Sequence, residues 1–377
     1  MYPGWEVTPL QQQAMEDVCR VQGWEIPGEF SLDPVNSPAA LIHWRCLVVV
    51  ANALAKSTLD EFRAKYAEAI HQTTETRTAP PEEDAGASDS KGEMDGFQQV
   101  MFAFDSHFHL DRLRNKLQLN SRAVVSDIVT RLPETSAEVR VEVAGAVAVY
   151  CDPSTYPEEE EIQLLRQENV RVVVGIHPKK YLTAEDLDRL KVLLTVPGVV
   201  GLGEVGIDHT VQPPEHWYYQ ERQLKSLLQF LPSDKVLVLH IRGTRGDKAG
   251  VEAYMRCLDI LEARVDRHQK IQLHCFTGTA HVVECWRIGF PNTHFSFSGI
   301  MAQFSEEQKE GLRSIPKENL LIETDAPYFP LCQQHQWSAP HFLNRTAQAV
   351  ADVLEDMTVE EVMELTERNG VRFFGPC

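Results

Sequence analysis

The segment VMFAFDSHFHLD, residues 100–111, distinguishes between two possible α/β folds for this chain. Its first half is an apolar run with the length and composition of a buried strand. A doubly wound open sheet would place a glycine-rich phosphate-binding turn directly after its first strand. Asp105, His107 and His109 occupy that position here. The segment therefore favours a parallel barrel over an open sheet.

Seven more apolar runs follow, and most of them precede a helix-length amphipathic stretch. The predicted strands cover residues 100–105, 143–150, 170–176, 199–203, 236–239, 271–273, 294–298 and 320–323. The predicted helices include residues 158–168, 184–194, 220–230, 247–263, 280–288, 305–314 and 342–354. This alternation is typical of a parallel barrel. We predict an α/β fold, a (β/α)8 TIM barrel spanning residues 97–377.

The residues before the barrel divide into two parts. Residues 1–72 contain three stretches with helical length or spacing, at 8–21, 37–55 and 57–69, and predict a small helical N-terminal extension. Residues 73–96 are rich in Pro, Gly, Ser and acidic residues, which is typical of a flexible linker. No motif in the extension indicates what it does or which protein partner it binds.

Composition indicates a globular protein of the cell interior. Hydrophobic residues make up 43% of the chain, enough for a sizeable core. No uncharged apolar stretch reaches the roughly 18 residues that a membrane-spanning helix needs. The N-terminus lacks a secretory signal pattern, and the eight cysteines form no C-x-x-C pair. We therefore expect a cytoplasmic or nuclear protein without a membrane partner.

The net charge of −19 limits how the chain can contact nucleic acid. A protein that binds DNA through a broad basic face would carry the opposite balance. Any such contact is expected to be local, at a cleft where bound cations offset the carboxylates. The charge disfavours a nonspecific binder and is compatible with a metal-assisted nuclease.

Imidazole and carboxylate side chains recur where the predicted strands end. In a TIM barrel these ends meet at one mouth, which carries the catalytic groups. A single buried histidine is commonly a hydrogen-bonded core residue, and a lone Asp after a strand is often a helix cap. Six such residues at five strand ends instead predict a metal centre. They are His107, His109, Glu204, His240, His274 and Asp325.

The mixture of ligands indicates the chemistry. Glu204 can bridge two cations because a carboxylate has two oxygens, and the imidazoles leave coordination positions open for water and substrate. Two divalent ions about 3.5–4 Å apart activate water and stabilise the charge that develops on a phosphodiester. We expect Asp325 to act as both ligand and general base. Nitrogen and oxygen ligands together suit Zn²⁺, Mn²⁺ or, less well, Mg²⁺.

Six strings in order along residues 100–375 resemble the successive signatures of the TatD family of metal-dependent deoxyribonucleases. The strings are FDSHFHLDRL (104–113), GIHP (175–178), GLGEVGID (201–208), LHIRG (239–243), LHCFTGT (273–279) and ETDAPYF (323–329). LHCFTG and ETDAPY together are specific. The long N-terminus is similar to that of the longer animal members. The resemblance implies a TIM barrel with 3′-directed exonuclease or endonuclease action on DNA, sometimes on RNA.

The resemblance also implies roles for individual residues. His107 and His109 would hold one metal with Asp325, Glu204 would bridge, and His240 and His274 would hold the second. His177 and Arg242 match positions near the scissile phosphate, where a guanidinium can pair with two oxygens. Each of these two residues could instead be structural: Arg242 in a surface ion pair, and His177 as a hydrogen-bonded core residue.

The chain departs from the family pattern at two places. Gly243 stands where the family usually has an acidic residue, and residues 115–136 are longer and more irregular than the usual first connection. The aromatic residues Trp217, Tyr218, Tyr219 and Trp337 are expected either to stack on bases or to pack helices, with packing the commoner role.

Two further functions are compatible with the same residues. A binuclear amidohydrolase or aminoacyl-ester hydrolase could use the same ions, but such enzymes often bridge their metals with a modified lysine where this chain has Glu204. Alternatively, the barrel could be a non-catalytic scaffold whose N-terminal extension docks a partner. Retention of the whole predicted ligand set favours the divalent-metal-dependent nuclease.

Overall fold

The computed structural model describes residues 99–133, 139–331 and 336–377. The predicted helical extension and linker lie outside these residues. Within the described residues, no helix has the length and apolar character required to cross a membrane.

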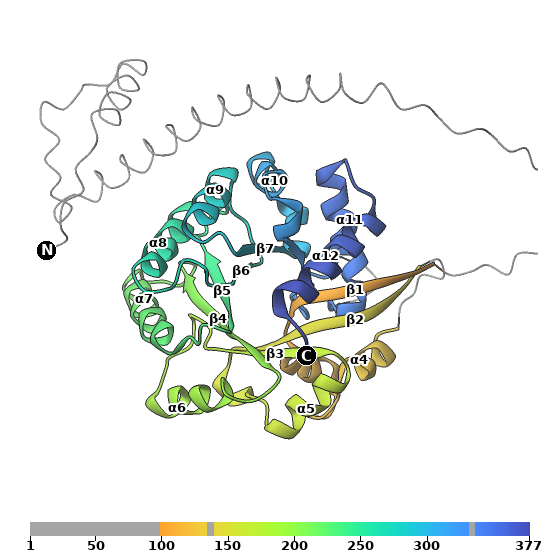
Figure 1. Ribbon diagram of the computed structural model, residues 1–377, viewed down its shortest axis with the longest axis horizontal. Helices are drawn as coiled ribbons and strands as arrows, with labels where there is room; N and C mark the ends of the chain where they lie inside the picture. Colours follow the sequence, from red (N-terminus) through yellow and green to blue (C-terminus); the bar gives the residue numbers. More distant parts are fainter. Residues whose placement is uncertain (1–98, 134–138, 332–335) are drawn as a thin grey trace, which may run out of the picture. The chain divides into compact units, whose positions relative to one another are not determined.

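Eight parallel strands pair in chain order, which confirms the predicted (β/α)8 barrel. Backbone bonds from Asp325 N to His107 O (3.0 Å) and from His109 N to Ala326 O (2.8 Å) join the first strand to the chain just after the last. Figure 1 shows the strands around a central axis with helices outside them. The strands are β1 Gln99–Phe108, β2 Val139–Tyr150, β3 Val170–Val174, β4 Val199–Asp208, β5 Val236–Arg242, β6 Ile271–His274, β7 Thr293–Phe297 and β8 Leu320–Ile322.

Several helices begin at strong local start signals. Thr183, Ser305 and Thr358 each form a capping box with the residue three positions later, which satisfies free N–H groups of the first turn. The helices are α3 Leu110–Leu117, α4 Val125–Arg131, α5 Glu159–Gln167, α6 Ala184–Leu193, α7 Glu215–Leu227, α8 Val251–Glu262, α9 Ala280–Gly289, α10 Glu306–Arg313, α11 Leu343–Leu354 and α12 Val359–Phe374. Short 3₁₀ turns are η1 Pro153–Thr155, η2 Leu228–Phe230, η3 Gly299–Gln303, η4 Lys317–Asn319 and η5 Pro340–Phe342.

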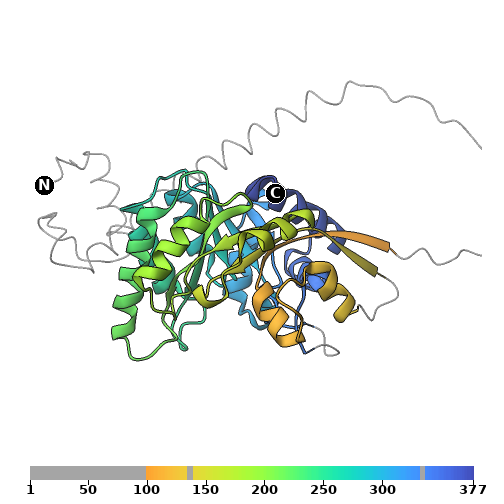
Figure 2. The ribbon, with the colours of Figure 1, turned by 90° about the horizontal axis from the view of Figure 1, so that it is seen from below.

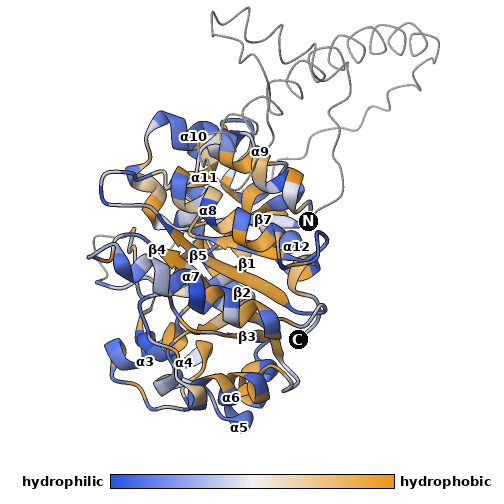
Figure 3. Cartoon of the chain, turned by 90° about the vertical axis from the view of Figure 1, so that its left-hand side faces the viewer, coloured by the Kyte–Doolittle hydropathy of each residue, from blue (hydrophilic) through white to orange (hydrophobic). Residues whose placement is uncertain are grey.

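The barrel interior is packed with apolar side chains. Val236 and Val238 of β5 belong to the interior cluster, whereas Leu237 and Leu239 pack in the cluster that includes the surrounding helices. This alternation follows from the two-residue period of strand side chains. Figure 3 shows the resulting hydrophobic strands beneath more polar helices. With the interior filled, polar groups are left to gather at an end of the barrel.

The other end of the barrel is closed by aromatic residues. The ring of Phe104 on β1 stacks on Phe374 at the end of α12, with centroids 5.9 Å apart. Arg171 of β3 donates two hydrogen bonds to Gly375 O, which holds the C-terminal residues against the strands. Beyond this closure, the first halves of β1 and β2 project past the helices (Figure 2), and Phe102 there is 57% exposed. The mouth at the C-terminal ends of the strands therefore carries the polar cluster.

Candidate metal centre

Glu204, near the end of β4, lies at the middle of the cluster. Its Oε2 lies 3.2 Å from His240 Nδ1 and 3.2 Å from His274 Nε2. Its Oε1 lies 3.6 Å from His109 Nε2, and His107 Nε2 is 4.0 Å from Oε2. The structure thus brings four imidazoles from β1, β5, β6 and the residue after β1 around one carboxylate.

Asp325 completes the group of six predicted residues. Its Oδ1 lies 3.3 Å from His109 Nε2 and 3.8 Å from His107 Nε2. The residue follows β8 with a positive φ of 48° in the left-handed region, and its N–H donates to His107 O at 3.0 Å. This backbone bond fixes the Asp325 carboxylate beside the two histidines of the first strand.

Three buried polar atoms of the centre lack a hydrogen-bond partner among the described residues. They are both ring nitrogens of His107 and Oδ1 of Asp325. A buried polar atom left unpaired costs about 1–3 kcal/mol, so protein interiors rarely keep several together. The group His107, His109 and Glu204, and the group Glu204, His240 and His274, each offer three ligand atoms within 4.8 Å of one another. The donor set therefore fits divalent cations.

Burial and mutual charge set the protonation states of the centre. Burial would raise the pKa of Glu204, but the surrounding imidazoles outweigh it and hold that pKa well below its usual value. The pKa of Asp325 is lowered in the same way, against burial, by His274, His109 and His107. Burial lowers the pKa of His107, and the neighbouring His274 adds to the effect. Ionised carboxylates and neutral imidazoles are the forms that bind metal.

His274 has the opposite shift. Burial lowers the pKa of His274, but the carboxylates of Glu323, Asp325 and Glu204 outweigh burial and raise the pKa to about 9. Its ring stacks on that of His107 with centroids 3.8 Å apart, so the two imidazoles cannot both be charged at low cost. Without a cation, the proton of the pair resides on His274; binding a divalent ion would displace it.

Each of three imidazoles is held by a partner on its outer nitrogen. His109 Nδ1 lies 3.1 Å from Val149 O, which as an acceptor requires that nitrogen to carry the proton. His274 Nδ1 lies 2.9 Å from Glu323 Oε1. His109 and His274 therefore direct Nε2 toward Glu204, an arrangement typical of metal-ligating histidines.

His240, the third of these imidazoles, has the reverse orientation. Its Nε2 lies 3.0 Å from Asp208 Oδ2, and its Nδ1 faces Glu204. Asp208 is itself fixed by Lys179 Nζ at 2.8 Å and by Thr210, whose N–H donates to Asp208 Oδ1 at 2.9 Å. The carboxylate therefore sets which nitrogen of His240 is free to bind an ion.

His177 lies at the cluster, whereas Arg242 lies beside it. His177 Nε2 is 3.9 Å from Glu204 Oε1, and its Nδ1 accepts a hydrogen bond from Lys179 N at 3.0 Å. Burial, with the neighbouring His240, lowers the pKa of His177 to about 3. Arg242, at the end of β5, donates from Nη1 to Cys275 O at 3.0 Å.

The structure explains the departure at Gly243. A Cβ at this position would lie 2.4 Å from Asp247 O and 2.6 Å from Gly250 Cα. The loop after β5 is too tight for any side chain there, so the acidic residue usual in the family cannot be accommodated.

Four contacts at the centre involve residues that sequence reasoning did not select. Glu323 and Asp208 orient histidines, while Cys151 Sγ donates to Glu204 Oε1 at 3.1 Å. Arg112 Nη2 lies 4.0 Å from the same oxygen. A signal existed for Asp208 and Glu323, because each is an acidic residue at the end of a strand that also carries or precedes a predicted ligand. Arg112 and Cys151 gave no comparable signal.

Two of the four aromatic residues weighed as base-stacking platforms have packing contacts around α7. Trp217 stacks on His209 with centroids 4.1 Å apart and donates from Nε1 to Val211 O. Tyr219 Oη accepts a hydrogen bond from Leu182 N at 2.9 Å. Their role is packing around α7, and only Tyr218 of this cluster is largely exposed, at 70%.

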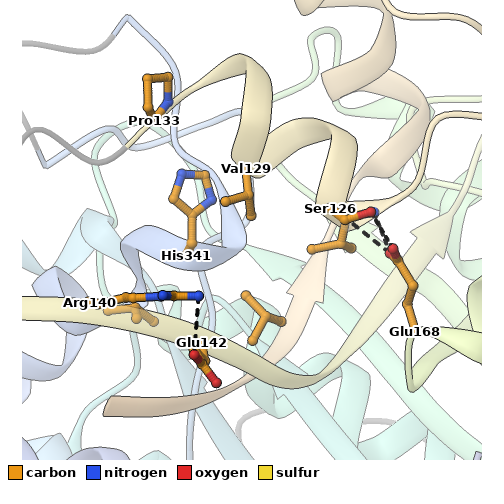
Figure 4. Close-up of a pocket in the computed structure, with 10 residues that line it drawn as sticks. Ser126, Val129, Pro133, Arg140, Glu142, Glu168 and His341 are labelled. Atoms are coloured by element: carbon orange, nitrogen blue, oxygen red, sulfur yellow. Dashed lines mark hydrogen bonds and ion pairs between the residues drawn. The ribbon is translucent and has the colours of Figure 1, made fainter. Parts of the chain in front are cut away.

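A cavity of about 620 Å³ lies away from the centre, between α4 and the first half of β2 (Figure 4). Val129, Val141 and Val143 line it, together with the exposed Arg140–Glu142 ion pair. None of the six predicted ligands borders this cavity. This cavity is therefore separate from the cluster of predicted ligands at the barrel mouth.

The known proteins that resemble this chain include several TatD or TatD-related proteins. Residues 104–375 match the family described as TatD related DNase. The chain is 32% identical over 280 residues to the human "3'-5' RNA nuclease TATDN2", an alignment covering 70% of this chain and 34% of that protein. The chain thus spans about a third of that relative's length.

Two other matches cover most of their proteins. The "3'-5' ssDNA/RNA exonuclease TatD" of Citrobacter rodentium is 27% identical over 63% of this chain and 89% of its own length. A crystal structure of a TatD family hydrolase from Entamoeba histolytica has a TM-score of 0.55 at 16% identity, covering 74% of this chain and 100% of that one. The structural likeness shows that the barrel fold is common to both.

Proposed function

The chain belongs to the TatD-related DNase family of metal-dependent hydrolases, and from this membership we propose that it is a divalent-metal-dependent nuclease that hydrolyses phosphodiester bonds in DNA or RNA. One observation carries the proposal: ligand nitrogens of three oriented histidines face the buried carboxylate of Glu204. Two relatives named as nucleases, one for RNA and one for single-stranded DNA and RNA, support the substrate class.

We assign the six residues to two cation positions. His107, His109 and Asp325 would hold one ion, His240 and His274 the second, and Glu204 would be shared. Such a pair of ions polarises a phosphodiester and makes water available as a nucleophile near neutral pH. Zn²⁺, Mn²⁺ and Mg²⁺ are the ions that this mixed set would accept.

The remaining chemistry is supplied by the protein's own side chains. Asp325 stays ionised and its Oδ1 has no hydrogen-bond partner among the described residues, so it can accept the proton of the attacking water. Arg242 would pair with non-bridging phosphate oxygens, as guanidinium groups commonly do. His177, with a pKa near 3, is neutral at physiological pH; because its Nδ1 accepts from Lys179 N, its Nε2 carries the proton and can donate one hydrogen bond at the phosphate.

The site of action follows from the same chemistry. Nucleic acid is the partner, bound locally at the metal cleft because the chain as a whole carries a net charge of −19. We place the protein in the cytoplasm or nucleus, where the five free cysteines of the described residues remain reduced.

A digest of labelled single-stranded and duplex DNA and RNA tests the proposal. Wild-type protein with Mn²⁺, Mg²⁺ or Zn²⁺ should shorten at least one substrate. Glu204→Ala and Asp325→Ala should each lower the rate of hydrolysis at least about a hundredfold, because the first removes the shared metal ligand and the second removes a metal ligand and the general base. Glu364→Ala, an exposed carboxylate on α12, is the matched control and should keep full activity.

Two results would overturn the proposal. Equal hydrolysis by all four proteins would place the activity in a contaminant or another site. Hydrolysis of acyl esters or amides, with no nucleic-acid cleavage under any metal, would assign the centre to amidohydrolase or aminoacyl-ester chemistry. Circular dichroism of each variant shows whether a loss of activity comes from misfolding.

A further inference from the structure

Two cationic side chains on α3 each lie against an aromatic ring from the segment after β8. Arg112 Cζ is 5.5 Å from the centroid of Tyr328, and Lys116 Nζ is 4.7 Å from the centroid of Trp337. Arg112 and Lys116 are four residues apart, so they share one face of the helix. We call these four residues the cation–aromatic strip; α3 is labelled in Figure 3.

The strip begins at the metal centre. Arg112 Nη2 lies 4.0 Å from Glu204 Oε1, and the Tyr328 ring packs edge-on against His109 with centroids 6.0 Å apart. Lys116 lies one helical turn further along α3, about 6 Å away. Tyr328 is 42% exposed and Lys116 is exposed, whereas Trp337 is half-buried and packs in part against the hydrophobic core. A chain that entered the centre along α3 would therefore pass both cations and both rings.

The guanidinium of Arg112 makes no hydrogen bond to a carboxylate among the described residues. Its two hydrogen bonds go to uncharged groups, Cys151 Sγ at 2.9 Å and Tyr328 Oη at 3.1 Å. Lys179 and Lys180, also near the mouth, are by contrast paired with the carboxylates of Asp208 and Asp152. The nearest carboxylate to Arg112 is that of Glu204, at 4.0 Å, and Glu204 also faces the imidazoles of the centre. In a protein with a net charge of −19, a guanidinium with this one long carboxylate contact marks a local site for an anion.

We propose that the cation–aromatic strip binds the end of a single-stranded nucleic acid and guides it into the metal centre, an inference that rests on the proposed function. Arg112 and Lys116 contact successive phosphates, and the rings of Tyr328 and Trp337 stack on bases. Proteins that bind single strands combine cations that follow the backbone with aromatic rings. A duplex keeps its bases stacked on one another, so it cannot use the two rings.

The strip is tested by measuring the affinity of the full chain, with Mn²⁺, for a labelled single-stranded oligonucleotide by fluorescence anisotropy. The oligonucleotide is an oligothymidylate of about twelve nucleotides with phosphorothioate linkages. Tyr328→Ala and Trp337→Ala should each weaken binding about 5- to 150-fold, the usual range for loss of one stacked base. The double variant R112Q/K116Q should reduce the slope of log affinity against log salt by about 1.4, or 0.7 for each phosphate contact.

Two further variants separate binding from structure. Tyr328→Phe keeps the ring and should bind within about twofold of wild type, although it loses the hydroxyl that Arg112 contacts. Lys191→Gln is the matched control for Lys116, because Lys191 on α6 lies 4.3 Å from the ring of Phe230 in the same kind of pairing. It should change neither affinity nor slope.

Hydrolysis of the unmodified oligonucleotide, measured in parallel, distinguishes the two proposals. Wild-type affinity and salt slope in all strip variants would overturn the strip, whether or not the chain cleaves. Equal affinity of wild type for a duplex of the same length would overturn its single-strand selectivity. Weakened binding in the variants, without cleavage by wild type, would overturn the nuclease and leave the strip in place.

Discussion

At the scale of single residues, the centre depends on side chains that hold its histidines. Glu323 is fully buried, and its Oε1 accepts hydrogen bonds from Cys275 N at 2.7 Å and from His274 Nδ1 at 2.9 Å. Its Oε2 accepts from Ser296 Oγ at 2.5 Å. Every partner of this carboxylate is a donor, so the carboxylate fixes both the position and the tautomer of His274.

Glu323→Gln should therefore weaken metal binding without removing a ligand. The amide NH₂ would face donors on one side, so His274 would lose its fixed orientation. We expect the Kd for Mn²⁺ or Zn²⁺ to rise about 10- to 100-fold, with the number of ions at saturation unchanged. Isothermal titration calorimetry measures both quantities. Glu364→Gln on α12 is the control, and an unchanged Kd in Glu323→Gln would show that the partner does not orient its histidine.

His294 on β7 predicts how stability responds to acid. Burial lowers the pKa of His294 to about 4; Arg372 and Lys270 add to this, and a hydrogen bond to Asn292 O opposes it. The unfolded chain binds the proton near pH 6.5 and the folded chain only near 4, so stability present above pH 6.5 is lost as pH falls toward 4. At about 1.4 kcal/mol per pKa unit the loss is on the order of 3 kcal/mol.

The measurement is the free energy of unfolding in urea between pH 7 and 4, for wild type and His294→Gln. The variant lacks this proton-binding difference, so its stability should fall less steeply over that range. Because the metal ligands titrate equally in both proteins, the difference between the two curves isolates His294. Parallel curves would mean that the pKa of His294 is the same in the folded and the unfolded chain.

At the scale of elements, the sequence predicted the strands better than the short helices. The structure contains all eight predicted strands. β1, β4 and β5 extend beyond their predicted ends, to Phe108, Asp208 and Arg242, because the polar residues there still pair with a neighbouring strand. α4 and the last three residues of α3 lie in residues 115–136, the stretch predicted to be irregular. The N-cap of α3, His109, makes no side-chain capping bond, and the N-cap of α4, Val124, has no polar side chain that could make one. These two helices therefore had no recognisable start signal.

The last helix had a signal and was not predicted. Thr358 and Glu361 form a capping box at the start of α12, and apolar residues recur along it at helical spacing. Its function is structural, because α12 lies against β1 and carries the aromatic residues that close the barrel.

Gly370 shows how tightly α12 is packed. A Cβ there would lie 2.3 Å from Cδ1 of Phe104, a buried ring wedged between Phe374 and Arg171. Alanine favours a helix over glycine by about 1 kcal/mol. We nevertheless expect Gly370→Ala to lower the free energy of unfolding by about 1–3 kcal/mol, the usual cost of overpacking.

Urea unfolding checks this value. Gly246→Ala is the matched control, since the nearest atom to its Cβ would be Thr244 Oγ1 at 4.0 Å, and its stability should change by less than about 0.5 kcal/mol. A Gly370→Ala protein as stable as wild type would show that Phe104 can move aside.

At the scale of the whole molecule, the grouping of the six predicted side chains could be predicted from the sequence, because the fold brings the ends of its strands together. Once eight parallel strands are predicted, His240 and His274 must approach Glu204, although 36 and 70 residues separate them. The contacts of Arg112 and Cys151 could not be read in the same way. They depend on the direction of α3 and of the chain after β2, which strand spacing does not determine.

The net charge of the whole chain is negative, whereas the proposed binding strip at the barrel mouth carries the cations Arg112 and Lys116. A net charge of −19 repels nucleic acid at long range, so under the proposed function the affinity would come from the cationic side chains at the mouth and from ions held at the centre. This dependence makes metal occupancy the condition on which the proposed activity rests.

The most direct test of the account is the number of divalent ions bound per chain, measured by elemental analysis after dialysis against Mn²⁺ or Zn²⁺ and by calorimetric titration. We predict two ions in the wild-type protein, and loss of both in Glu204→Gln, because the shared carboxylate loses the charge that holds them together. Wild-type protein that binds no ion, or a Glu204→Gln protein that still binds two with wild-type affinity, would contradict the central claim.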